Sequence, residues 1–272
     1  MHDVFFFTDI HGHRALFDAI MNYCHEQDPE AMIIFGGDAI DRGSDGYQIM
    51  KELLDNPKVC YLKGNHEDMF CKAAREIKEE VVFDNMNREC VRQTIHWCRG
   101  YDYRYSNIQL TLVNGGLETL TDWVMDGMPM DLVDRVNHLP LTFNYGNCDF
   151  CHSACAYKSF ERVANAEYED AVPDSYAAES LIWGRTGLNF DWAPNHIAVF
   201  GHTPTPYLED YIDFKYSENN AIPVLYNEGR KLDMDTGAIF TNRAYVLNVL
   251  TMQAQGFEIE NDSLKKIECI QF

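Results

Sequence analysis

Aspartate, histidine and asparagine side chains recur directly after three apolar runs in the first 70 residues. They are Asp9 with His11, Asp38, and Asn65 with His66. Because one residue separates Asp9 from His11, both side chains project to the same side of an extended segment and can bind one cation. Asp38 can bridge that cation and a second one. A set of nitrogen and oxygen donors without thiolate suits manganese, iron or zinc.

Two later histidines can complete the shell of the second ion together with the amide oxygen of Asn65. His152 lies in the β-prone run 149–153, and His202 follows the apolar run 197–200. This set forms only if the strands that carry the two histidines belong to the same sheet as the first three apolar runs, or to a sheet packed against it.

The elements that must position these residues alternate between strands and helices. Apolar runs and helical periodicity predict strands at 4–8, 32–35 and 59–62, and helices at 16–27 and 47–55. This order requires parallel strands with right-handed crossovers. Ligands gather at the carboxyl ends of such strands, where the polar residues lie. We therefore predict an α/β fold with its functional residues along one sheet edge.

The remainder of the chain divides into a helical part and a part rich in strands. Residues 69–138 have helical and mixed patterns, which predict a helical insertion or cap. Further strands are expected at 149–153, 197–200, 238–241 and 244–250, with a strand or short helix at 258–272. Because 272 residues are near the size that one core supports, we predict a single domain over 1–272 that carries the insertion.

The net charge excludes several classes of partner. Lysine and arginine total 22, whereas aspartate and glutamate total 43, which gives a formal charge of −21. A field of this sign repels polyanions, so nucleic acids and anionic membranes are poor partners. No run approaches the roughly 20 apolar residues of a spanning helix, and the first residues lack the pattern of a secretion signal. We expect a cytoplasmic protein of unspecified oligomeric state.

Nine cysteines in a chain of this length favour free thiols in a reducing compartment over a disulfide framework. The sequence CDFCHSAC at 148–155 contains a CxxC pair and a histidine, which is compatible with structural zinc. A fourth ligand of the usual paired spacing is missing, however, and buried free cysteine is common in strands. We therefore favour structural thiols over a zinc site in this segment.

Four spaced motifs and one isolated histidine carry a resemblance to a known family. The motifs are DxHG at 9–12, GDxxDRG at 37–43, GNHE at 64–67 and GHTP at 201–204, with His152 between the last two. The chain resembles the calcineurin-like metallophosphoesterases. Within them it resembles the phosphoprotein phosphatase branch, which holds Ser/Thr phosphatases, their bacterial and phage relatives, and diadenosine tetraphosphatases. The resemblance implies a sandwich of two mixed β-sheets flanked by helices.

Carried over residue by residue, the resemblance implies two divalent metal ions, with manganese expected and iron or zinc as alternatives. The first ion is assigned to Asp9, His11 and Asp38. The second ion is assigned to Asp38, Asn65, His152 and His202.

The resemblance also implies roles in catalysis. His66 is the general acid that protonates the leaving oxygen, and Asp41 orients and charges it. Arg42, Arg185 and Asn65 bind the substrate phosphate, and Arg185 lies where bacterial and phage members place a second phosphate-binding arginine.

The sequence departs from the family pattern at a few positions. Thr8 replaces the usual glycine before the first aspartate, and Lys63 stands where many relatives have arginine. Ser153 and Ala154 replace a small pair that ends in glycine. None of these changes removes a ligand. His152 has little local context, so His138 and His196 are competitors for its role.

These residues together predict a phosphomonoesterase, with a Ser/Thr protein phosphatase as the leading interpretation. Two divalent ions, two aspartates and a bridging hydroxide leave about one net positive charge in an acidic protein, which attracts a phosphate ester. The hydroxide is expected to attack in line without a covalent intermediate. A phosphorylated protein or a small phosphoester is the expected substrate.

Other functions share some of these features. Symmetrical hydrolysis of dinucleoside tetraphosphates uses the same motifs, and aromatic residues in the insertion could stack a nucleobase, although such residues are more often core. They are Trp97, Tyr101, Tyr103 and Trp123. A cyclic nucleotide or nucleic-acid phosphodiesterase fits the net charge less well. A non-catalytic scaffold predicts an eroded site, whereas every expected residue is present.

Overall fold

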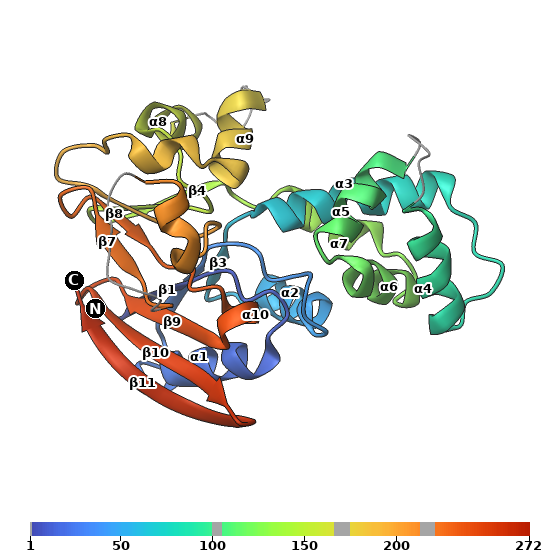
Figure 1. The fold of residues 1–272 in the computed structure, drawn as a ribbon, viewed down its shortest axis with the longest axis horizontal. Helices are drawn as coiled ribbons and strands as arrows, with labels where there is room; N and C mark the ends of the chain where they lie inside the picture. The colour runs from blue at the N-terminus through green and yellow to red at the C-terminus, as the bar shows by residue number, and fades with distance from the viewer. Residues whose placement is uncertain (1, 100–104, 166–174, 213–220) are drawn as a thin grey trace.

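The computed structural model describes residues 2–99, 105–165, 175–212 and 221–272, and contains two β-sheets (Figure 1). The six-stranded sheet has the order β11-β10-β9-β1-β2-β3, and the five-stranded sheet has the order β4-β5-β6-β8-β7. Strands β1 to β3 pair in parallel and β9 joins β1 antiparallel. In the second sheet β5, β6 and β8 are parallel, with antiparallel β4 and β7 at the edges. Both sheets are therefore mixed, which confirms the predicted fold.

The strand bounds are as follows. The first sheet comprises β1 (Val4–Phe7), β2 (Met32–Phe35), β3 (Val59–Tyr61), β9 (Arg243–Asn248), β10 (Gln253–Glu260) and β11 (Ser263–Gln271). The second sheet comprises β4 (Thr142–Tyr145), β5 (Cys148–Cys151), β6 (Ile197–Phe200), β7 (Val224–Tyr226) and β8 (Lys231–Asp233).

The sheets pack face to face through alternate side chains of their strands. Phe6 of β1 lies against Phe150 of β5, with ring centroids 5.1 Å apart. The neighbours Phe5 and Phe7 point to the opposite face of the first sheet and pack against α1 (Arg14–Gln27) and α2 (Gly46–Asp55). Helices α8 (Tyr157–Ala164) and α9 (Ser175–Trp183) cover the outer face of the second sheet. The result is a four-layer sandwich.

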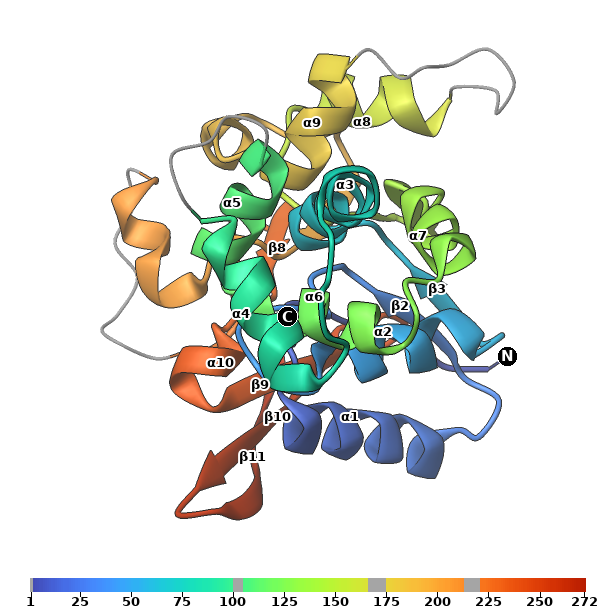
Figure 2. The same ribbon diagram turned by 90° about the vertical axis from the view of Figure 1, so that its right-hand side faces the viewer.

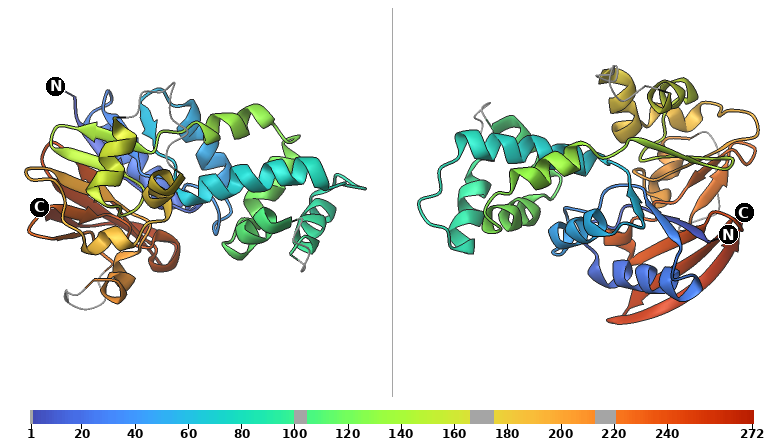
Figure 3. Two further views of the ribbon diagram at one scale, coloured as in Figure 1. Left: turned by 90° about the horizontal axis from the view of Figure 1, so that it is seen from above. Right: turned by 180° about the vertical axis from the view of Figure 1, so that it is seen from behind.

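In the described residues between β3 and β4, five α-helices extend away from the sandwich (Figures 1 and 3). They are α3 (Asn65–Glu80), α4 (Arg88–Trp97), α5 (Ser106–Val113), α6 (Leu117–Met125) and α7 (Met130–Asn137). Their apolar side chains join the core that lies under α1 and α2, so one hydrophobic cluster runs through both parts. That residues 69–138 are an insertion into one domain over 1–272 stays our interpretation of this arrangement.

Short helices complete the chain: η2 (Thr186–Asn189), η3 (Thr205–Asp210) and α10 (Ala238–Thr241). The predicted strand at 238–241 is wrong, because α10 occupies it. Gly237 and Asn242 have φ values of 71° and 55° and bracket a single helical turn, which reverses the chain before β9. No helix in the described ranges is long and apolar enough to cross a membrane. All nine cysteines carry free thiols.

Candidate metal centre

The predicted ligands converge where strand ends of both sheets meet the start of α3. The loops after β1 and β2 supply Asp9, His11 and Asp38, and the first residue of α3 is Asn65. The loops after β5 and β6 supply the last two residues, His152 and His202. All six side chains are buried. The structure therefore brings together six residues that the sequence distributes over almost 200 positions.

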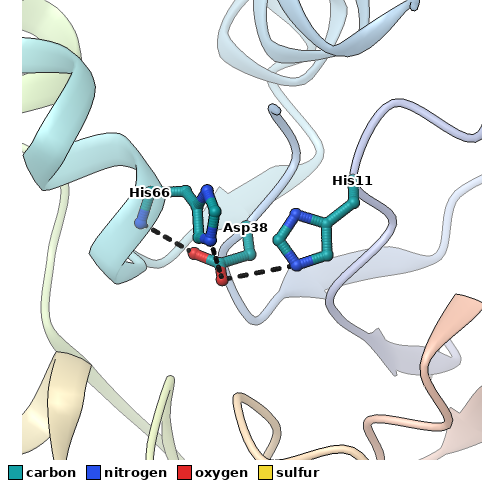
Figure 4. A group of neighbouring side chains, drawn as sticks. All are labelled: His11, Asp38 and His66. Atoms are coloured by element: carbon teal, nitrogen blue, oxygen red, sulfur yellow. Dashed lines mark hydrogen bonds and ion pairs between the residues drawn. The ribbon is translucent and has the colours of Figure 1, made fainter. Parts of the chain in front are cut away.

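Two groups of potential ligand atoms share Asp38. The first is Asp38 with His11 and His66, and the second is Asp38 with His152 and His202; in each group the atoms lie within 4.8 Å of one another. The Asp38 Oδ2 atom lies 3.6 Å from His11 Nε2 and 3.8 Å from His66 Nε2 (Figure 4). Its Oδ1 atom lies 3.4 Å from His152 Nε2. The carboxylate thus faces a histidine group on each side.

Backbone carbonyls fix the orientation of two of these histidines. The Nδ1 atom of His11 lies 2.9 Å from the Ile40 carbonyl oxygen, and that of His152 lies 2.8 Å from the Gly36 carbonyl oxygen. Donation from Nδ1 places Nε2 on the side of Asp38, and a second ring nitrogen bonded to a backbone carbonyl is the arrangement expected of metal-binding imidazoles.

Asn65 lies between the two histidines of the second sheet. Its Oδ1 atom is 3.1 Å from His152 Nε2 and 2.9 Å from His202 Nδ1. The buried His202 Nε2 atom has no hydrogen-bond partner among the described residues. A buried nitrogen left without a partner is costly, and a bound cation or an ordered water satisfies such groups.

Asp9 belongs to neither histidine group. Its Oδ2 atom accepts a hydrogen bond of 2.6 Å from the Thr8 hydroxyl and one of 3.1 Å from the backbone N–H of His202. The residue that replaces the family glycine therefore contacts the first aspartate directly. These bonds hold the Asp9 carboxylate at the junction of the two sheets.

The backbone of the candidate site is unusual because six of the predicted site residues have left-handed φ angles. They are Asp9, His11, Asp38, Asp41, Arg42 and His202, with φ between 46° and 70°. Aspartate and histidine tolerate this region better than most residues, whereas Arg42 has no such advantage. Conformations of this kind persist only where the surroundings determine them, and they cluster at functional sites.

Two glycines allow the backbone to approach the carboxylates. A Cβ atom on Gly64 would lie 2.2 Å from Asp38 Oδ1, and one on Gly201 would lie 2.1 Å from Asp9 Oδ2. Neither position can carry a side chain unless the carboxylate moves.

Glu67 holds the Asp38 loop and was not among the predicted site residues. Its carboxylate accepts hydrogen bonds from the backbone N–H groups of Asp38, Ala39 and Gly64 and from the Tyr61 hydroxyl, at 2.7 to 2.9 Å. Glu67 is the third residue of α3 and accepts from the backbone N–H of the N-cap residue Gly64, so a glutamate three residues after the start of the helix was a sequence signal that could have found it.

Burial and neighbouring charges set the pKa values of the carboxylates. Burial raises the pKa of Asp9 to about 7, with the charge of Asp38 acting in the same direction and that of His152 opposing it. Burial also works to raise the pKa of Asp38, but His152, His66 and His11 outweigh it, and this pKa lies well below its usual range. Asp38 is therefore the anionic centre of the site.

The histidines separate into two classes. Burial, with neighbouring positive charges, holds the pKa values of His11 and His202 well below the usual range. Both imidazoles are therefore neutral and retain a nitrogen lone pair that can bind a cation. Burial works to lower the pKa of His152, but Asp38 dominates and raises it to about 10. A cation bound at His152 must displace this proton, and metal binding at the site is therefore coupled to proton release.

His66 is paired with Asp41 beside the histidine groups. Its Nδ1 atom lies 2.7 Å from Asp41 Oδ2. Burial works to lower the pKa of His66, but Asp38 and Asp41 raise it overall. The Arg42 guanidinium lies 3.1 Å from His66 Nε2 and 2.7 Å from His11 Nε2. Carboxylate, imidazole and guanidinium thus form one contact chain.

Both predicted phosphate-binding arginines lie beside exposed aromatic rings. Arg42 Cζ is 5.7 Å from the centroid of Phe240, and Arg185 Cζ is 5.5 Å from that of Tyr211. The buried Nε atom of Arg185 has no hydrogen-bond partner within the described part of the chain. Such a donor is suited to bind an anion.

The competing histidines and the aromatic residues have other surroundings. His138 Nδ1 lies 2.7 Å from the Asp134 carbonyl oxygen, and His196 pairs with Asp149, so His152 alone of the three contacts Asp38. Trp123 is fully buried against Phe70 and is core. Trp97 is 84% exposed at the end of α4. Tyr101 and Tyr103 lie outside the described residues, and no cysteine belongs to either described histidine group.

Comparison with known proteins gives one family match and several solved structures. The sequence model of the calcineurin-like phosphoesterase family matches residues 2–242. A search of curated proteins found no match. A structure provisionally described as a diadenosine tetraphosphatase is 13% identical, with a TM-score of 0.50, over 98% of this chain and 93% of its own. A mutant cold-active protein tyrosine phosphatase has the same identity and TM-score over 98% and 81%.

A protein serine/threonine phosphatase from Saccharomyces cerevisiae is 12% identical, with a TM-score of 0.48, over 100% of this chain and 81% of its own. At these identities only the two structures with a TM-score of 0.50 bear on the fold, whereas the family match covers most of the sequence. The chain belongs to the calcineurin-like phosphoesterase family and is a metal-dependent phosphoester hydrolase.

Proposed function

We propose that the protein is a phosphomonoesterase that uses two divalent cations and acts on phosphoserine or phosphothreonine in proteins. The observation that carries this proposal is the position of the Asp38 carboxylate, which faces a histidine group on each side. A single carboxylate between two groups of histidine nitrogens is an arrangement that a pair of cations can share.

The donor set fits such cations. Asp9, His11 and Asp38 would hold one ion, and Asp38, Asn65, His152 and His202 would hold the other. The donors are nitrogen and oxygen atoms, which suit manganese, with iron or zinc as alternatives, and the unpartnered His202 Nε2 atom is available to one of them. When bound, the two ions supply an activated water and positive charge for the phosphate.

The chain's own residues supply the proton for the leaving group. Asp41 accepts from His66 Nδ1, which directs Nε2 toward the site. Asp38 and Asp41 raise the pKa of His66, which favours its protonated form, and this form can give its proton to an alkoxide. Arg42 and Arg185 bind the phosphate oxygens, and their planar guanidinium groups suit this task.

Three substrates compared side by side test this proposal. The protein is treated with a chelator and manganese is added back. Phosphate release is then measured from a phosphoserine peptide and an alkyl phosphate, and formation of ADP, the product of symmetrical cleavage, is measured from diadenosine tetraphosphate. We expect manganese-dependent release from the first two. Hydrolysis of the dinucleotide alone contradicts the assignment to phosphomonoesters.

The variant His66→Asn tests the proton donor. Its kcat on the alkyl phosphate should fall by roughly 10² to 10⁴, the usual contribution of a general acid, while the manganese content stays unchanged. His138→Asn is the matched control, since His138 is exposed and bonds only its own helix. Loss of manganese in His66→Asn would instead identify His66 as a ligand.

A further inference from the structure

We propose that Thr119, on helix α6, is a positioning residue for the proton donor of the reaction. The backbone N–H of Asp41 donates a hydrogen bond of 3.1 Å to the Thr119 hydroxyl oxygen, although 78 residues separate the two. Asp41 in turn accepts from His66 Nδ1 at 2.7 Å. This inference rests on the proposed role of His66.

The contact is buried, so water cannot replace it. Asp41 is 1% exposed and Thr119 is 2% exposed. Helix α6 packs beside α2, which follows the Asp41 loop (Figure 2). A buried backbone N–H that loses its acceptor is costly, so the loop has a strong preference for the position that Thr119 provides.

The turn before α6 adds a second set of contacts to the same loop. The backbone N–H of Arg42 donates to the Gly115 carbonyl oxygen at 3.0 Å. A Cβ atom on Gly116 would lie 3.1 Å from Asp41 Oδ1 and 2.4 Å from the Thr111 methyl group. The Gly115–Gly116 turn therefore packs closely against the Asp41–Arg42 peptide, and only small residues allow this approach.

The loop needs this external support because of its own conformation. Asp41 and Arg42 are consecutive residues with φ of 69° and 67°. Such a pair is strained for residues other than glycine and persists only where surrounding contacts determine it. The backbone N–H groups of Asp41 and Arg42 donate to α6 and to the turn before it. This helical region therefore positions Asp41 and, through Asp41, the imidazole of His66.

The dependence of the rate on the leaving group tests this role. A proton donor accelerates departure of a strongly basic alkoxide and matters little for 4-nitrophenolate. Thr119→Val removes the acceptor with little change of shape, and Thr119→Ser retains it. Thr121→Val is the matched control, because Thr121 is buried on the same helix and its hydroxyl bonds only the Leu117 carbonyl oxygen.

We expect Thr119→Val to lower kcat on the alkyl phosphate about tenfold, the value of one hydrogen bond, and to change kcat on 4-nitrophenyl phosphate less than about twofold. Thr119→Ser should restore the ratio of the two rates, and Thr121→Val should leave it unchanged. Thr119→Ala provides a second test if the valine variant folds poorly. Equal effects on both substrates overturn the inference.

His66→Asn separates this inference from the proposed function. If His66→Asn lowers the alkyl-to-aryl rate ratio and Thr119→Val does not, the positioning role of Thr119 alone fails. If His66→Asn leaves that ratio unchanged, His66 is not the proton donor, and the inference about Thr119 fails with it.

Discussion

The two sides of the candidate metal centre are built differently. On the first-sheet side, the loops after β1 and β2 are bonded to each other through backbone atoms: Asp9 and His11 donate N–H bonds of 3.0 Å to the carbonyl oxygens of Gly37 and Asp38. On the second-sheet side, each loop supplies a single histidine as a potential metal ligand. His152 contacts Gly36, Asn65 and Asp38 through its side chain. His202 contacts Asn65 through its side chain and Asp9 through its backbone N–H.

This difference shows which side of the site is held in position by hydrogen bonds of its own. The loops after β1 and β2 form a continuous hydrogen-bonded unit. The Glu67 carboxylate fixes this unit by accepting from the backbone N–H groups of Asp38 and Gly64. The second-sheet histidines depend on the packing of one sheet against the other, and Asp38 is the ligand that both sides approach. Substitutions on each side should therefore have different consequences.

Replacing the shared carboxylate should affect both sides and have the largest effect. We expect Asp38→Asn to lower kcat on a phosphoserine peptide by roughly a thousandfold or more, because metal charge contributes several kcal/mol to such reactions. Activity and manganese per chain are measured after loading. Asp134→Asn, an exposed aspartate paired with Arg75, is the control. Two manganese ions per chain with kcat within tenfold of wild type would contradict the shared role.

Removing one histidine from each side should separate the two ions. We expect His11→Gln and His202→Gln each to weaken the binding of one manganese ion about a hundredfold or more, since even residues behind the ligands contribute 10- to 100-fold. Calorimetric titration with manganese measures both sites. Retention of two sites of native affinity in either variant contradicts the assignment of that histidine.

Changing the support of the first-sheet loops should lower stability. We expect Glu67→Gln to reduce the free energy of unfolding by about 1 to 3 kcal/mol, because an amide group replaces an acceptor that faces buried N–H donors. Tyr61→Phe removes only one of the four bonds and should cost about 1 kcal/mol. Urea unfolding measures both. A smaller loss in Glu67→Gln than in Tyr61→Phe shows that the backbone donors do not need the carboxylate.

A buried lysine gives the second sheet a distinct pH dependence. Lys231 of β8 donates to the Gly187 carbonyl oxygen, and burial lowers its pKa to about 8. Between pH 8 and roughly 10.5 the unfolded chain holds this proton and the folded chain does not, so the folded state gains stability as pH rises. The free energy of unfolding of the wild type minus that of Lys231→Met should therefore rise with pH, by at most about 1.4 kcal/mol per pH unit.

Urea unfolding at pH 7.5 and pH 9.5 measures this slope. The same substitution at Lys58, which lies on the surface and pairs with Glu30, is the control and should show no comparable rise. A difference between wild type and Lys231→Met that is constant with pH would show that Lys231 has the same protonation in the folded and unfolded chain.

The first 70 residues were predictable because their structure follows from local patterns. Apolar runs and helical periodicity predict the β-α-β-α-β order, and the rule about strand ends places the polar residues on one edge. Other strands escaped this reasoning. Strand β8 contains Lys231 and Asp233. Charged residues of this kind are typical of exposed loops, but the fold buries both. Such burial depends on partners that only the folded chain supplies.

The candidate site was predictable to a similar degree. Asp9, His11, Asp38 and Asn65 follow from the positions of the strand ends. His152 and His202 followed only on the condition that their strands lie in the same sheet or in one packed against it, because one histidine after a strand has little local signal. Thr119 could not be predicted at all. Its partner lies 78 residues away, and nothing in the sequence around it indicates a contact with Asp41.

The hydrogen bond between the His202 backbone and Asp9 joins residues 193 positions apart. A ribosome must therefore add most of a large domain after Asp9 before the partner of that aspartate is synthesised. Strand β9, which pairs with β1, emerges later still. A nascent chain, or a product of premature termination before His202, contains the motifs of the first 70 residues but lacks an assembled centre. We therefore expect hydrolytic activity only after most of the domain has been translated.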